Sequence, residues 1–524
     1  MNDSTTLEEV LAQDFRTLPE LIRMHAVQRP QHSALRQDAR SLDYGSLDDL
    51  VDRIAASLQR DGVKAKQRIA ICAGTSIEYA AVFIGALRAG AAVAPLAPSS
   101  SAASIAGMVG DAGATLLFVD ASVAKALEPV RDRIAAQWVA LDDSAAGKSF
   151  RQWLVAAGTV PATVVAEPDA PFNLIYSSGT TGTPKGIEQS NLMRWRQWQR
   201  AFAYDYKPDS ITIVSTPLYS NTTLVSFLPT LAVGATVVLM AKFDATKFLQ
   251  LAQEHRATTA MLVPVQYARI MALPEFDRYD LTGFRAKFCT SAPFAAHLKA
   301  DILKRWPGRL IEYYGMTEGG GTCVLEATLH PHKLHTVGCP APGHDIRLID
   351  DQGCELPPGS TGEVVGHSEG IMTGYYNQPA KTAEAEWHDA TGRRFIRTGD
   401  IGRFDEDGFL ILMDRKKDMI ISGGFNVYPS DLEAVLHAHA DVAEAAVVGV
   451  PSERWGETPV AFVVAKRQDP QLPKTLLDWT NGQLGKTQRI AAIELVETLP
   501  RSAIGKVLKR ELRDAYKDKA LALK

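Results

Sequence analysis

The sequence predicts an α/β protein: a large N-terminal domain made of two parallel-sheet α/β subdomains and a small β-barrel, followed by a smaller α+β C-terminal domain. Three observations predict this fold. From about residue 18 to 310, β-rich apolar runs alternate with amphipathic helical stretches, which is typical of parallel sheets covered by helices. From about 338 to 412, short strands are separated by turns. After residue 418 the mixed α and β pattern returns.

The α/β region contains the clearest individual elements. A helix over 79–88 is expected to precede a strand over 91–95. Further strands are predicted at 68–72, 115–119, 211–215, 235–239 and 259–263. The two most apolar stretches, 79–98 and 225–241, are interrupted by Arg88 and Pro95 and by Pro229 and Gly234. We therefore expect no membrane span.

The later elements define the expected domain boundaries. Residues 338–412 predict an antiparallel, barrel-like segment within an N-terminal domain of residues 1–413. The charged segment 414–418, which in the resemblance described below corresponds to a hinge, separates this domain from a predicted C-terminal domain of residues 419–524. That domain should contain a helix near 429–437, strands at 445–450 and 459–465, and a basic C-terminal helix.

Composition limits the functional class. The 524 residues are 46% hydrophobic and 22% charged, as in a folded enzyme of two to four domains. A net charge of -4 gives no reason to expect a nucleic-acid partner. The five cysteines form no C-x-x-C pair, and the acidic N-terminus does not resemble a signal peptide. We therefore expect a cytoplasmic protein without disulfides, and a homodimer is a possible assembly.

The strongest local signal is the segment 176–186, which follows an apolar run. Its hydroxyl residues and glycines allow backbone N–H and side-chain O–H groups to approach one anion, and Lys185 adds a positive charge. The lysine lies between proline and glycine, so this is not a Walker loop. The segment predicts a polyphosphate site; a flexible Ser/Gly/Thr linker is the alternative interpretation.

This loop resembles the signature of the adenylate-forming superfamily of acyl-CoA synthetases, peptide-synthetase adenylation domains and luciferases. Four further motifs of that family follow in order, at 313–318, 397–400, 414–424 and 500–506. The chain is most similar to bacterial aryl- or acyl-CoA ligases such as 4-coumarate CoA ligase. The resemblance implies an ATP-dependent, AMP-forming acid–thiol ligase with a mobile C-terminal domain.

The resemblance also implies roles for individual residues. Lys506, Thr317, Glu318 and Lys185 would be catalytic, with Lys506 acting as a fixed cation between the carboxylate and the α-phosphate. Glu318 and Thr180 would hold Mg²⁺, Asp400 and Arg415 would bind the ribose, and the segment 290–293 would face the adenine ring. The implied ATP- and AMP-binding residues are Ser177, Ser178, Gly179, Thr180, Thr181, Gly182, Thr183, Lys185, Ser291, Ala292, Pro293, Tyr313, Tyr314, Gly315, Met316, Thr317, Asp400, Arg415 and Lys506.

For the second half-reaction, the resemblance places the hinge at Lys417 and a CoA site at Ser422, Gly423, Gly424 and Trp455. The chain departs from the family pattern at 487–491, where lysines that contact CoA phosphates are expected. Lys486 and Arg489 are the substitutes that the sequence offers. Mg²⁺ is thus the expected cofactor, with ATP and CoA as co-substrates.

The implied acyl pocket has a distinctive composition. Its residues are Tyr219, Ser220, Asn221, Met261, Cys289, Tyr313, Gly315, Gly320 and Gly321, and a helix near 195–202 is its expected wall. Ser220 stands where many relatives have histidine, and three glycines follow Glu318, so the pocket should be deep. Tyr219, Asn221 and Tyr313 favour an aromatic, hydroxycinnamate- or benzoate-like acid, unless other groups of the protein satisfy them. A medium- or long-chain fatty acid, delivery to a carrier protein and a luciferase-like oxidation are the alternatives.

Overall fold

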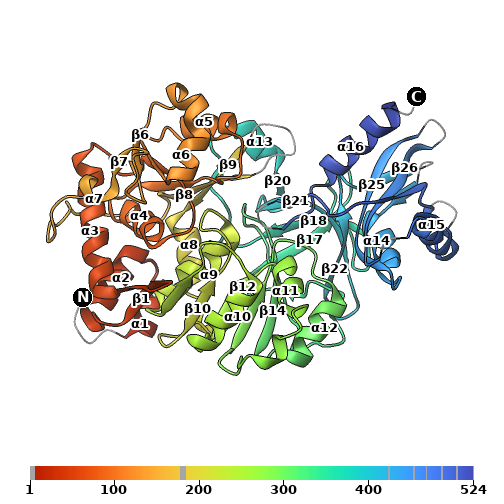
Figure 1. Cartoon of the computed structure of the whole chain (residues 1–524), viewed down its shortest axis with the longest axis horizontal. Coiled ribbons are helices and arrows are strands. Elements are labelled where there is room, and N and C mark those ends of the chain that lie inside the picture. Colours follow the sequence, from red (N-terminus) through yellow and green to blue (C-terminus); the bar gives the residue numbers. More distant parts are fainter. Residues whose placement is uncertain are drawn as a thin grey trace. The chain divides into compact units, whose positions relative to one another are not determined.

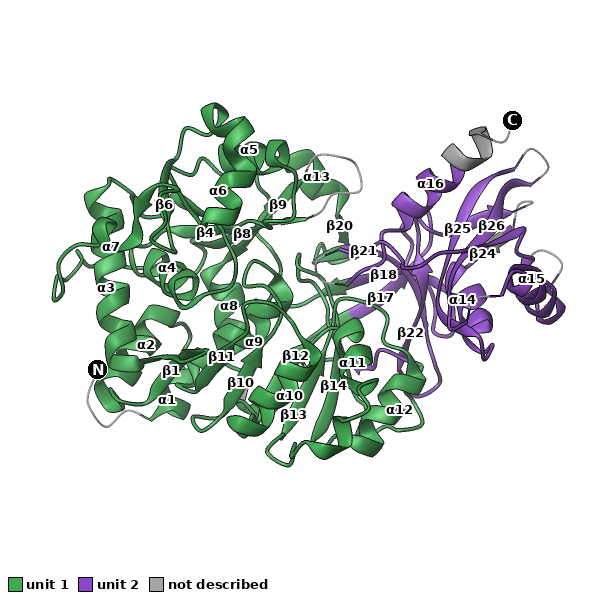
Figure 2. Ribbon diagram, in the orientation of Figure 1, with its two compact units in different colours: residues 1–335, 340–345, 366–396 green, residues 336–339, 346–365, 397–524 purple. Residues whose placement is uncertain are grey.

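A computed structural model of the chain describes residues 6–177, 184–422, 425–452, 455–467, 469–485, 488–502 and 505–522. The chain divides into two compact units (Figure 2). The first contains residues 1–335, 340–345 and 366–396, and the second contains 336–339, 346–365 and 397–524. This grouping places the hinge segment 414–418 inside the second unit, and the domain boundary expected at residues 413/414 stays a prediction.

Figure 1 labels many of the helices and strands. The helices are α1 (Leu7–Leu11), α2 (Leu18–Gln28), α3 (Tyr44–Arg60), α4 (Ile77–Arg88), α5 (Ala102–Asp111), α6 (Ala121–Leu127), α7 (Phe150–Trp153), α8 (Asn191–Trp198), α9 (Asn221–Ala232), α10 (Ala245–Glu254), α11 (Pro264–Met271), α12 (Ala296–Arg305), α13 (Pro379–Glu384), α14 (Pro429–His437), α15 (Leu472–Gln483) and α16 (Lys509–Ala522), with short 3₁₀ turns η1 (Glu128–Arg133), η2 (Ala201–Tyr204) and η3 (Phe276–Arg278).

The strands are β1 (Ser33–Gln37), β2 (Arg40–Asp43), β3 (Arg68–Cys72), β4 (Ala92–Pro95), β5 (Leu116–Val119), β6 (Gln137–Ala140), β7 (Lys148–Ser149), β8 (Pro171–Ser177), β9 (Lys185–Ser190), β10 (Ile211–Val214), β11 (Thr236–Leu239), β12 (Thr259–Leu262), β13 (Ala286–Cys289), β14 (Arg309–Tyr314), β15 (Cys323–Glu326), β16 (Cys339–Pro340), β17 (Asp345–Ile349), β18 (Gly362–His367), β19 (Gly374–Tyr375), β20 (Glu386–His388), β21 (Arg394–Phe404), β22 (Leu410–Arg415), β23 (Ile420–Ser422), β24 (Phe425–Val427), β25 (Val442–Ser452), β26 (Gly456–Ala465) and β27 (Ala492–Leu495).

Two large sheets confirm the α/β class. One has nine strands in the order β16-β15-β14-β13-β12-β10-β11-β1-β2, and the other has eight in the order β19-β9-β8-β4-β3-β5-β6-β7. Their central strands are parallel, as predicted. Antiparallel strands extend them near the edges: β9 pairs with β8, and β15 pairs with β14. These antiparallel pairs flank the phosphate loop and the segment 315–322, so both motifs lie at strand ends.

The helix starts follow directly from the sequence. Small polar side chains accept hydrogen bonds from backbone N–H groups of the first turn, which would otherwise lack a partner. Ser76 caps α4 in this way, Asp244 caps α10, and Ser190 caps α8. The cap at Ser190 begins α8 at Asn191, so the pocket helix expected near 195–202 starts earlier, ends at Trp198 and continues into η2.

The cores lie between helices and sheets. In the first unit, one cluster of fully buried side chains joins α2, α3 and α4 to strands of both sheets, and a second covers the opposite face of the eight-stranded sheet. The apolar stretches noted in the sequence become α4 with β4, and α9 with β11, all of which are buried. None of the described helices has the length and apolar character that crossing a membrane requires.

The second unit contains antiparallel strands and a separate α+β layer. This unit contains β17, β22 and parts of β18 and β21, which belong to a sheet in the order β17-β18-β21-β20 with β22 beside β21. Strand β21 pairs with β22 in antiparallel register, and closure of this region into a barrel stays a prediction. The last hundred residues form a five-stranded sheet in the order β24-β23-β26-β25, with β27 beside β26. Helices α14 and α15 cover one face and α16 covers the other; α14 and α16 are the helices that the sequence pattern predicts, and α15 is an additional one.

Candidate active site

The phosphate loop connects two paired strands of the first unit. Strands β8 and β9 form an antiparallel hairpin in which Ser177 lies opposite Lys185. Residues Ser178, Gly179, Thr180, Thr181, Gly182 and Thr183 lie outside the described residues. The structure thus fixes both ends of the loop. Lys185 Nζ lies 4.7 Å from the centroid of the Tyr375 ring, a cation–π contact.

The carboxylate of Glu318 contacts the same tyrosine. The Tyr375 hydroxyl donates to Glu318 Oε1 at 2.8 Å, and the backbone N–H of Met372 donates to the Glu318 carbonyl at 2.8 Å. Burial and the charge of Glu318 raise the pKa of Tyr375, so its hydroxyl stays a donor. Tyr375 therefore contacts two of the expected catalytic residues, Lys185 and Glu318, although no sequence motif indicated it.

Glycine is required next to Glu318. Gly319 has a φ of +76°, and a Cβ there would stand 1.9 Å from the Gly370 carbonyl oxygen. Gly320 has a φ of +83°, and its Cβ would stand 2.7 Å from the Gly366 carbonyl oxygen. The glycines that the sequence associates with a deep pocket are therefore also needed for close backbone packing.

A buried arginine joins three segments of the site. Arg194 on α8 is fully buried and donates to the side-chain oxygens of Asn173 on β8, Gln189 on β9 and Asn221 on α9. It also donates to Gln197 Oε1 at 3.0 Å. Burial lowers the pKa of Arg194 to about 9. Among the described residues no carboxylate forms an ion pair with it, so neutral amides and the Phe172 ring, 5.7 Å from its guanidinium carbon, stabilise this cation.

This network extends to the family motif at residues 313–318. Gln189 Nε2 donates to the backbone carbonyl of Thr317 at 2.6 Å. Through Gln189, Arg194 therefore connects the strand after the phosphate loop, the start of α9 and the residue before Glu318. The side-chain oxygen of Asn221 accepts from Arg194 at 2.8 Å, so this expected pocket residue has a partner within the protein.

The other expected pocket residues differ in exposure. Met261 and Cys289 are almost fully buried on β12 and β13. Burial raises the pKa of the Cys289 thiol far above its ordinary value, so it remains a neutral thiol. Tyr313 is only partly buried and stacks on Phe288 with 5.7 Å between ring centroids.

Neighbouring polar residues of the expected pocket have protein contacts. Tyr219 forms a hydrogen bond with the side chain of Ser99. The segment 290–293, expected to face adenine, follows β13, and Ser291 adopts a φ of +84°. The hydroxyls of Ser291 and Thr222 are within hydrogen-bond distance of each other. This contact joins the nucleotide segment to the start of α9.

Strand β14 contains the first residues of the motif at 313–318, and a buried ion pair holds this strand in place. Lys299 on α12 contacts Glu312, the residue before Tyr313, and both side chains are at most 6% exposed. Tyr314 lies opposite Cys323 on β15. The chain direction into residues 315–318 is therefore set by both neighbouring elements.

The second unit gathers its own motif residues. Arg415 Nε lies 3.1 Å from Asp400 Oδ1, so the expected ribose-binding pair forms an ion pair. Lys506 is close enough to both for their charges to act on it. Burial, with the nearby charges of Arg415 and Lys417, lowers the pKa of Lys506 to about 8. Residues more than a hundred positions apart in the sequence thus come together around one lysine.

Acidic side chains anchor the hinge segment. Lys416 Nζ lies 2.8 Å from Asp351 and 3.2 Å from Glu363, and Arg397 also donates to Glu363. Lys417, the expected hinge residue, has an exposed side chain, and partial desolvation of its ammonium group lowers its pKa.

The expected CoA residues are only partly described. Ser422 is buried and lies opposite Gly456, whereas the Trp455 side chain is 47% exposed. Arg489 is described and exposed. Gly423, Gly424 and Lys486 lie outside the described residues.

Glu318 is the described residue that is expected to hold Mg²⁺. The described residues contain no cluster of three or more His, Cys, Asp or Glu side chains suited to a metal. Magnesium bound to a nucleotide is held mainly by phosphate and water, with one or two carboxylates. Glu318 fits that requirement because the Tyr375 hydroxyl contacts only Oε1. Thr180, the other expected ligand, lies outside the described residues.

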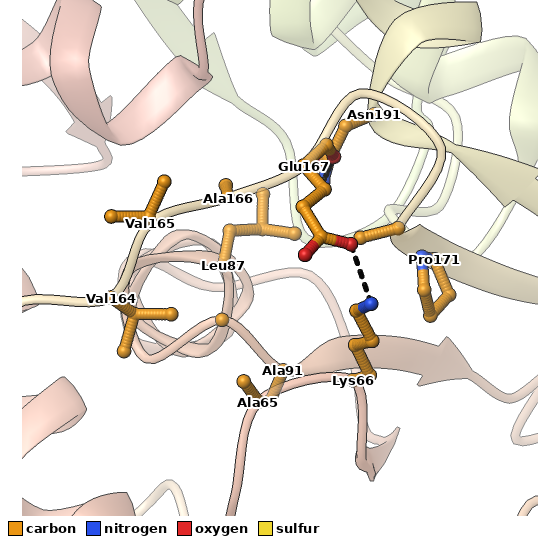
Figure 3. Close-up of a pocket in the computed structure, with 12 residues that line it drawn as sticks. Ala65, Lys66, Leu87, Ala91, Val164, Val165, Ala166, Glu167, Pro171 and Asn191 are labelled. Carbon is orange, nitrogen blue, oxygen red and sulfur yellow. Dashed lines mark hydrogen bonds and ion pairs between the residues drawn. The ribbon is translucent and has the colours of Figure 1, made fainter.

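A separate pocket lies away from these motifs (Figure 3). It is lined by apolar side chains, including Leu87 and Val164, and by the ion pair of Lys66 and Glu167. It contains none of the expected site residues and offers only two charged groups, which neutralise each other. We assign it no role.

Comparison with known proteins decides the family. The family model for the AMP-binding enzyme matches residues 22–376, and the model for the AMP-binding enzyme C-terminal domain matches residues 431–506. The chain belongs to the AMP-binding enzyme family. It is therefore an adenylate-forming acid ligase, as the sequence motifs predict.

Curated relatives cover nearly the whole chain. A fatty acid–[acyl-carrier-protein] ligase, ScoC of Streptomyces coeruleorubidus, is 32% identical over 96% of both chains. An indoleacetate–CoA ligase of Aromatoleum aromaticum is 32% identical over 95% of this chain and 97% of its own. A feruloyl-CoA synthase of an Amycolatopsis species is also 32% identical, over 93% and 96%.

Solved structures agree with the fold. ATP-bound MatB from Rhodopseudomonas palustris has a TM-score of 0.86 and 28% identity, and the match covers 96% of this chain and 99% of that one. The amide bond synthetase McbA from Marinactinospora thermotolerans has a TM-score of 0.84 and 27% identity, with 95% and 99% covered.

Proposed function

We propose that this family member is an ATP- and Mg²⁺-dependent acid:CoA ligase that acts on an aromatic carboxylic acid. The observation that carries the proposal is the group formed by Lys506, Asp400 and Arg415 in the second unit. It joins the expected ribose ligands to the one lysine whose charge the first half-reaction needs.

In the first half-reaction, a carboxylate oxygen of the acid attacks the α-phosphorus of ATP. The bond to the bridging oxygen breaks, pyrophosphate leaves with the electron pair, and a mixed anhydride with AMP remains. Both reactants are anions, so catalysis depends on holding positive charge where they meet. Lys506 supplies this charge as an ammonium group, and Lys185 supplies it at the phosphate loop.

Magnesium, when bound, neutralises phosphate charge, and Glu318 is the carboxylate that would hold it. The protein's own contribution there is geometric. Tyr375 holds Glu318 by a hydrogen bond and contacts Lys185 through its ring. Asp400 and Arg415 form the ion pair proposed to face the ribose hydroxyls.

In the second half-reaction, the thiol sulfur of CoA attacks the acyl carbon, AMP leaves, and a thioester forms. We infer a change of backbone torsion at Lys417 that removes Lys506 and brings Ser422 and its neighbouring glycines toward the acyl group. The exposed Trp455 side chain supports stacking on the CoA adenine, and Arg489 supports a phosphate contact.

An aromatic acid is favoured by two observations. Tyr313, Phe288 and Tyr204 form a continuous aromatic wall, with Tyr204 edge-on to Tyr313 at 5.4 Å. Two relatives are named for aromatic acids, indoleacetate and ferulate. A fatty acid, with CoA or a carrier protein as acceptor, is the second candidate, because ScoC is named for that reaction.

The half-reactions test the proposal separately. Replacing Lys506→Ala should abolish adenylation while largely preserving thioester formation from supplied acyl-AMP. Lys417→Pro should restrict the hinge and slow at least one half-reaction. Equal loss of both half-reactions in Lys506→Ala would contradict the assigned role of Lys506, and wild-type rates in Lys417→Pro would contradict the hinge.

A further inference from the structure

Two basic side chains of the first unit face each other without an acceptor between them. Arg200 directly follows α8, and its Nη1 lies 2.6 Å from Nε2 of His344. On the other side of the imidazole, the backbone N–H of Thr322 donates to Nδ1 at 2.9 Å. Both partners of this histidine are therefore N–H donors.

The contact between Arg200 and His344 is unfavourable because it places two hydrogen-bond donors against each other. A neutral imidazole has one nitrogen lone pair, and Thr322 uses the lone pair on Nδ1. Nε2 must then carry hydrogen and faces the guanidinium, which is also only a donor. Protonation would not help, since burial and Arg200 lower the pKa of His344 to about 4. No carboxylate of the described residues forms an ion pair with Arg200. An oxygen acceptor between the two groups would satisfy both.

The pair lies next to the expected acyl pocket. Thr322, which holds His344, follows the glycines after Glu318, and its Oγ1 is 3.3 Å from the position that a Cβ on Gly315 would occupy. Burial raises the pKa of Tyr204, and the nearby Arg200 partly opposes that rise. Tyr204 in turn contacts Tyr313. The neighbours of His344 and of Arg200 therefore lie next to Gly315 and Tyr313, which the sequence assigns to the pocket.

The turn that carries His344 is well defined. The Ala341 N–H donates to the Thr322 carbonyl, and the His344 N–H donates to the Ala341 carbonyl, both at 2.9 Å. Gly343 adopts a φ of +78°, and a Cβ there would lie 3.6 Å from Arg200 Nη2. His344 is thus fixed by backbone hydrogen bonds, while the longer Arg200 side chain can move to admit a ligand atom.

We propose that Arg200 and His344 form a subsite for an oxygen acceptor at the end of the substrate remote from its reacting carboxyl. The substrate is then an acid with a second carboxylate or a phenolic oxygen. Arg200 donates a charge-assisted hydrogen bond to that oxygen, and His344 donates from Nε2. This inference rests on the proposed function and narrows its substrate class.

Matched pairs of acids test the subsite. Acid-dependent ATP–pyrophosphate exchange is measured with cinnamate, 4-hydroxycinnamate and 4-carboxycinnamate, and with dodecanoate against dodecanedioate. In the wild-type protein, kcat/KM should be about 10–100-fold higher for the acid with the remote oxygen in at least one series, the range expected for a hydrogen bond to a charged group. The hydroxy and carboxy arms distinguish a phenol from a carboxylate.

Variants of Arg200 and His344 test whether these two residues cause the preference for an acid with a remote oxygen. In Arg200→Met and in His344→Phe, the ratio within each matched pair should fall toward one. Arg200→Lys keeps the charge and should retain part of the preference for the carboxylate. Arg269→Met, which changes an exposed arginine on α11, should keep the wild-type ratio. Thermal unfolding midpoints establish that each variant is folded.

The outcomes separate the subsite from the proposed function. A ratio near one in the wild-type protein, or a ratio unchanged in both Arg200→Met and His344→Phe, overturns the subsite while the ligase activity stands. If no acid supports exchange, the proposed function fails, and the subsite fails with it.

Discussion

The Tyr375 hydroxyl donates a hydrogen bond to Glu318 Oε1 at 2.8 Å, and Lys185 Nζ lies 4.7 Å from the centroid of the same ring. Glu318 and Lys185 come from motifs far apart in the sequence, and Tyr375 belongs to neither motif. A single side chain therefore sets the spacing between the expected metal ligand and the expected phosphate-binding lysine.

Replacing Tyr375→Phe should separate these two contacts. The ring and its contact with Lys185 remain, whereas the hydrogen bond to a charged group, worth about 1.5–3 kcal/mol, is lost. We expect kcat/KM for ATP to fall about tenfold and half-maximal activity to require more Mg²⁺. A magnesium titration of pyrophosphate release measures this. Tyr376→Phe is the matched control, because that ring faces Arg68. Equal magnesium dependence in wild type and Tyr375→Phe would contradict the assignment.

The Arg194 network predicts a large effect on stability. Arg194→Met leaves buried oxygens of Asn173, Gln189 and Asn221 without their shared donor. Because each buried oxygen left without a hydrogen-bond partner typically costs about 1–3 kcal/mol, denaturant unfolding should show a loss of about 3 kcal/mol or more. Arg196→Met removes a more exposed ion pair with Glu369 and should cost less than about 1 kcal/mol. A similar loss of unfolding free energy in Arg194→Met and Arg196→Met would contradict the conclusion that the Arg194 network stabilises the fold more than a surface ion pair does.

The lowered pKa of Lys506 predicts a pH limit for adenylation. Below its pKa of about 8 the ammonium group is charged, and above it the charge is lost. Above pH 8, kcat/KM for ATP should therefore fall toward tenfold per pH unit. Lys506→Arg, which stays charged, should lack this decline even if its rate is lower. Lys509→Arg serves as the control and should retain it. A decline shared by Lys506→Arg would assign the ionisation to another group.

His25 predicts an acid-dependent loss of stability. Its Nε2 donates to the Ala232 carbonyl, and burial lowers its pKa to about 4 from an ordinary value of 6.5. The unfolded chain binds the proton more readily, so stability is complete above pH 6.5 and is lost as pH falls toward 4. This shift corresponds to about 3 kcal/mol.

His25→Gln should show a smaller decrease in unfolding free energy over the same interval, while His344, also with a pKa of about 4, contributes equally to both proteins. Chemical unfolding at pH 7, 5.5 and 4.5 provides the comparison. An identical pH slope in wild type and His25→Gln would show that His25 does not control this stability.

The sequence predicts the regular elements well where the local pattern is strong. The strand at Arg68–Cys72 and the helix at Pro429–His437 have the predicted bounds, since continuous burial and a proline at the helix start are visible locally. The pocket helix expected near 195–202 differs, because the Ser190 side chain caps α8 and the helix therefore begins at Asn191. The antiparallel strands beside the motifs depend on pairing, which no single segment reveals.

The site was predicted through motifs, and the residues outside them were missed. Tyr375 lies 57 positions from Glu318, and His344 lies 144 positions from Arg200. An isolated tyrosine, histidine or arginine carries no local signal of such contacts. Arg194 resembles a solvated helix residue in the sequence, although the fold buries it completely. These contacts follow from tertiary packing, so only the structure could identify them.

The most direct test measures AMP and pyrophosphate release with ATP and Mg²⁺, over aromatic, short-chain and long-chain acids, with and without CoA. The proposed function predicts CoA-dependent turnover with an aromatic acid and a thioester product. The contrary result is pyrophosphate release that CoA does not accelerate, with no consumption of CoA, for every acid tested. That result would contradict CoA as the acceptor and leave only the adenylating activity.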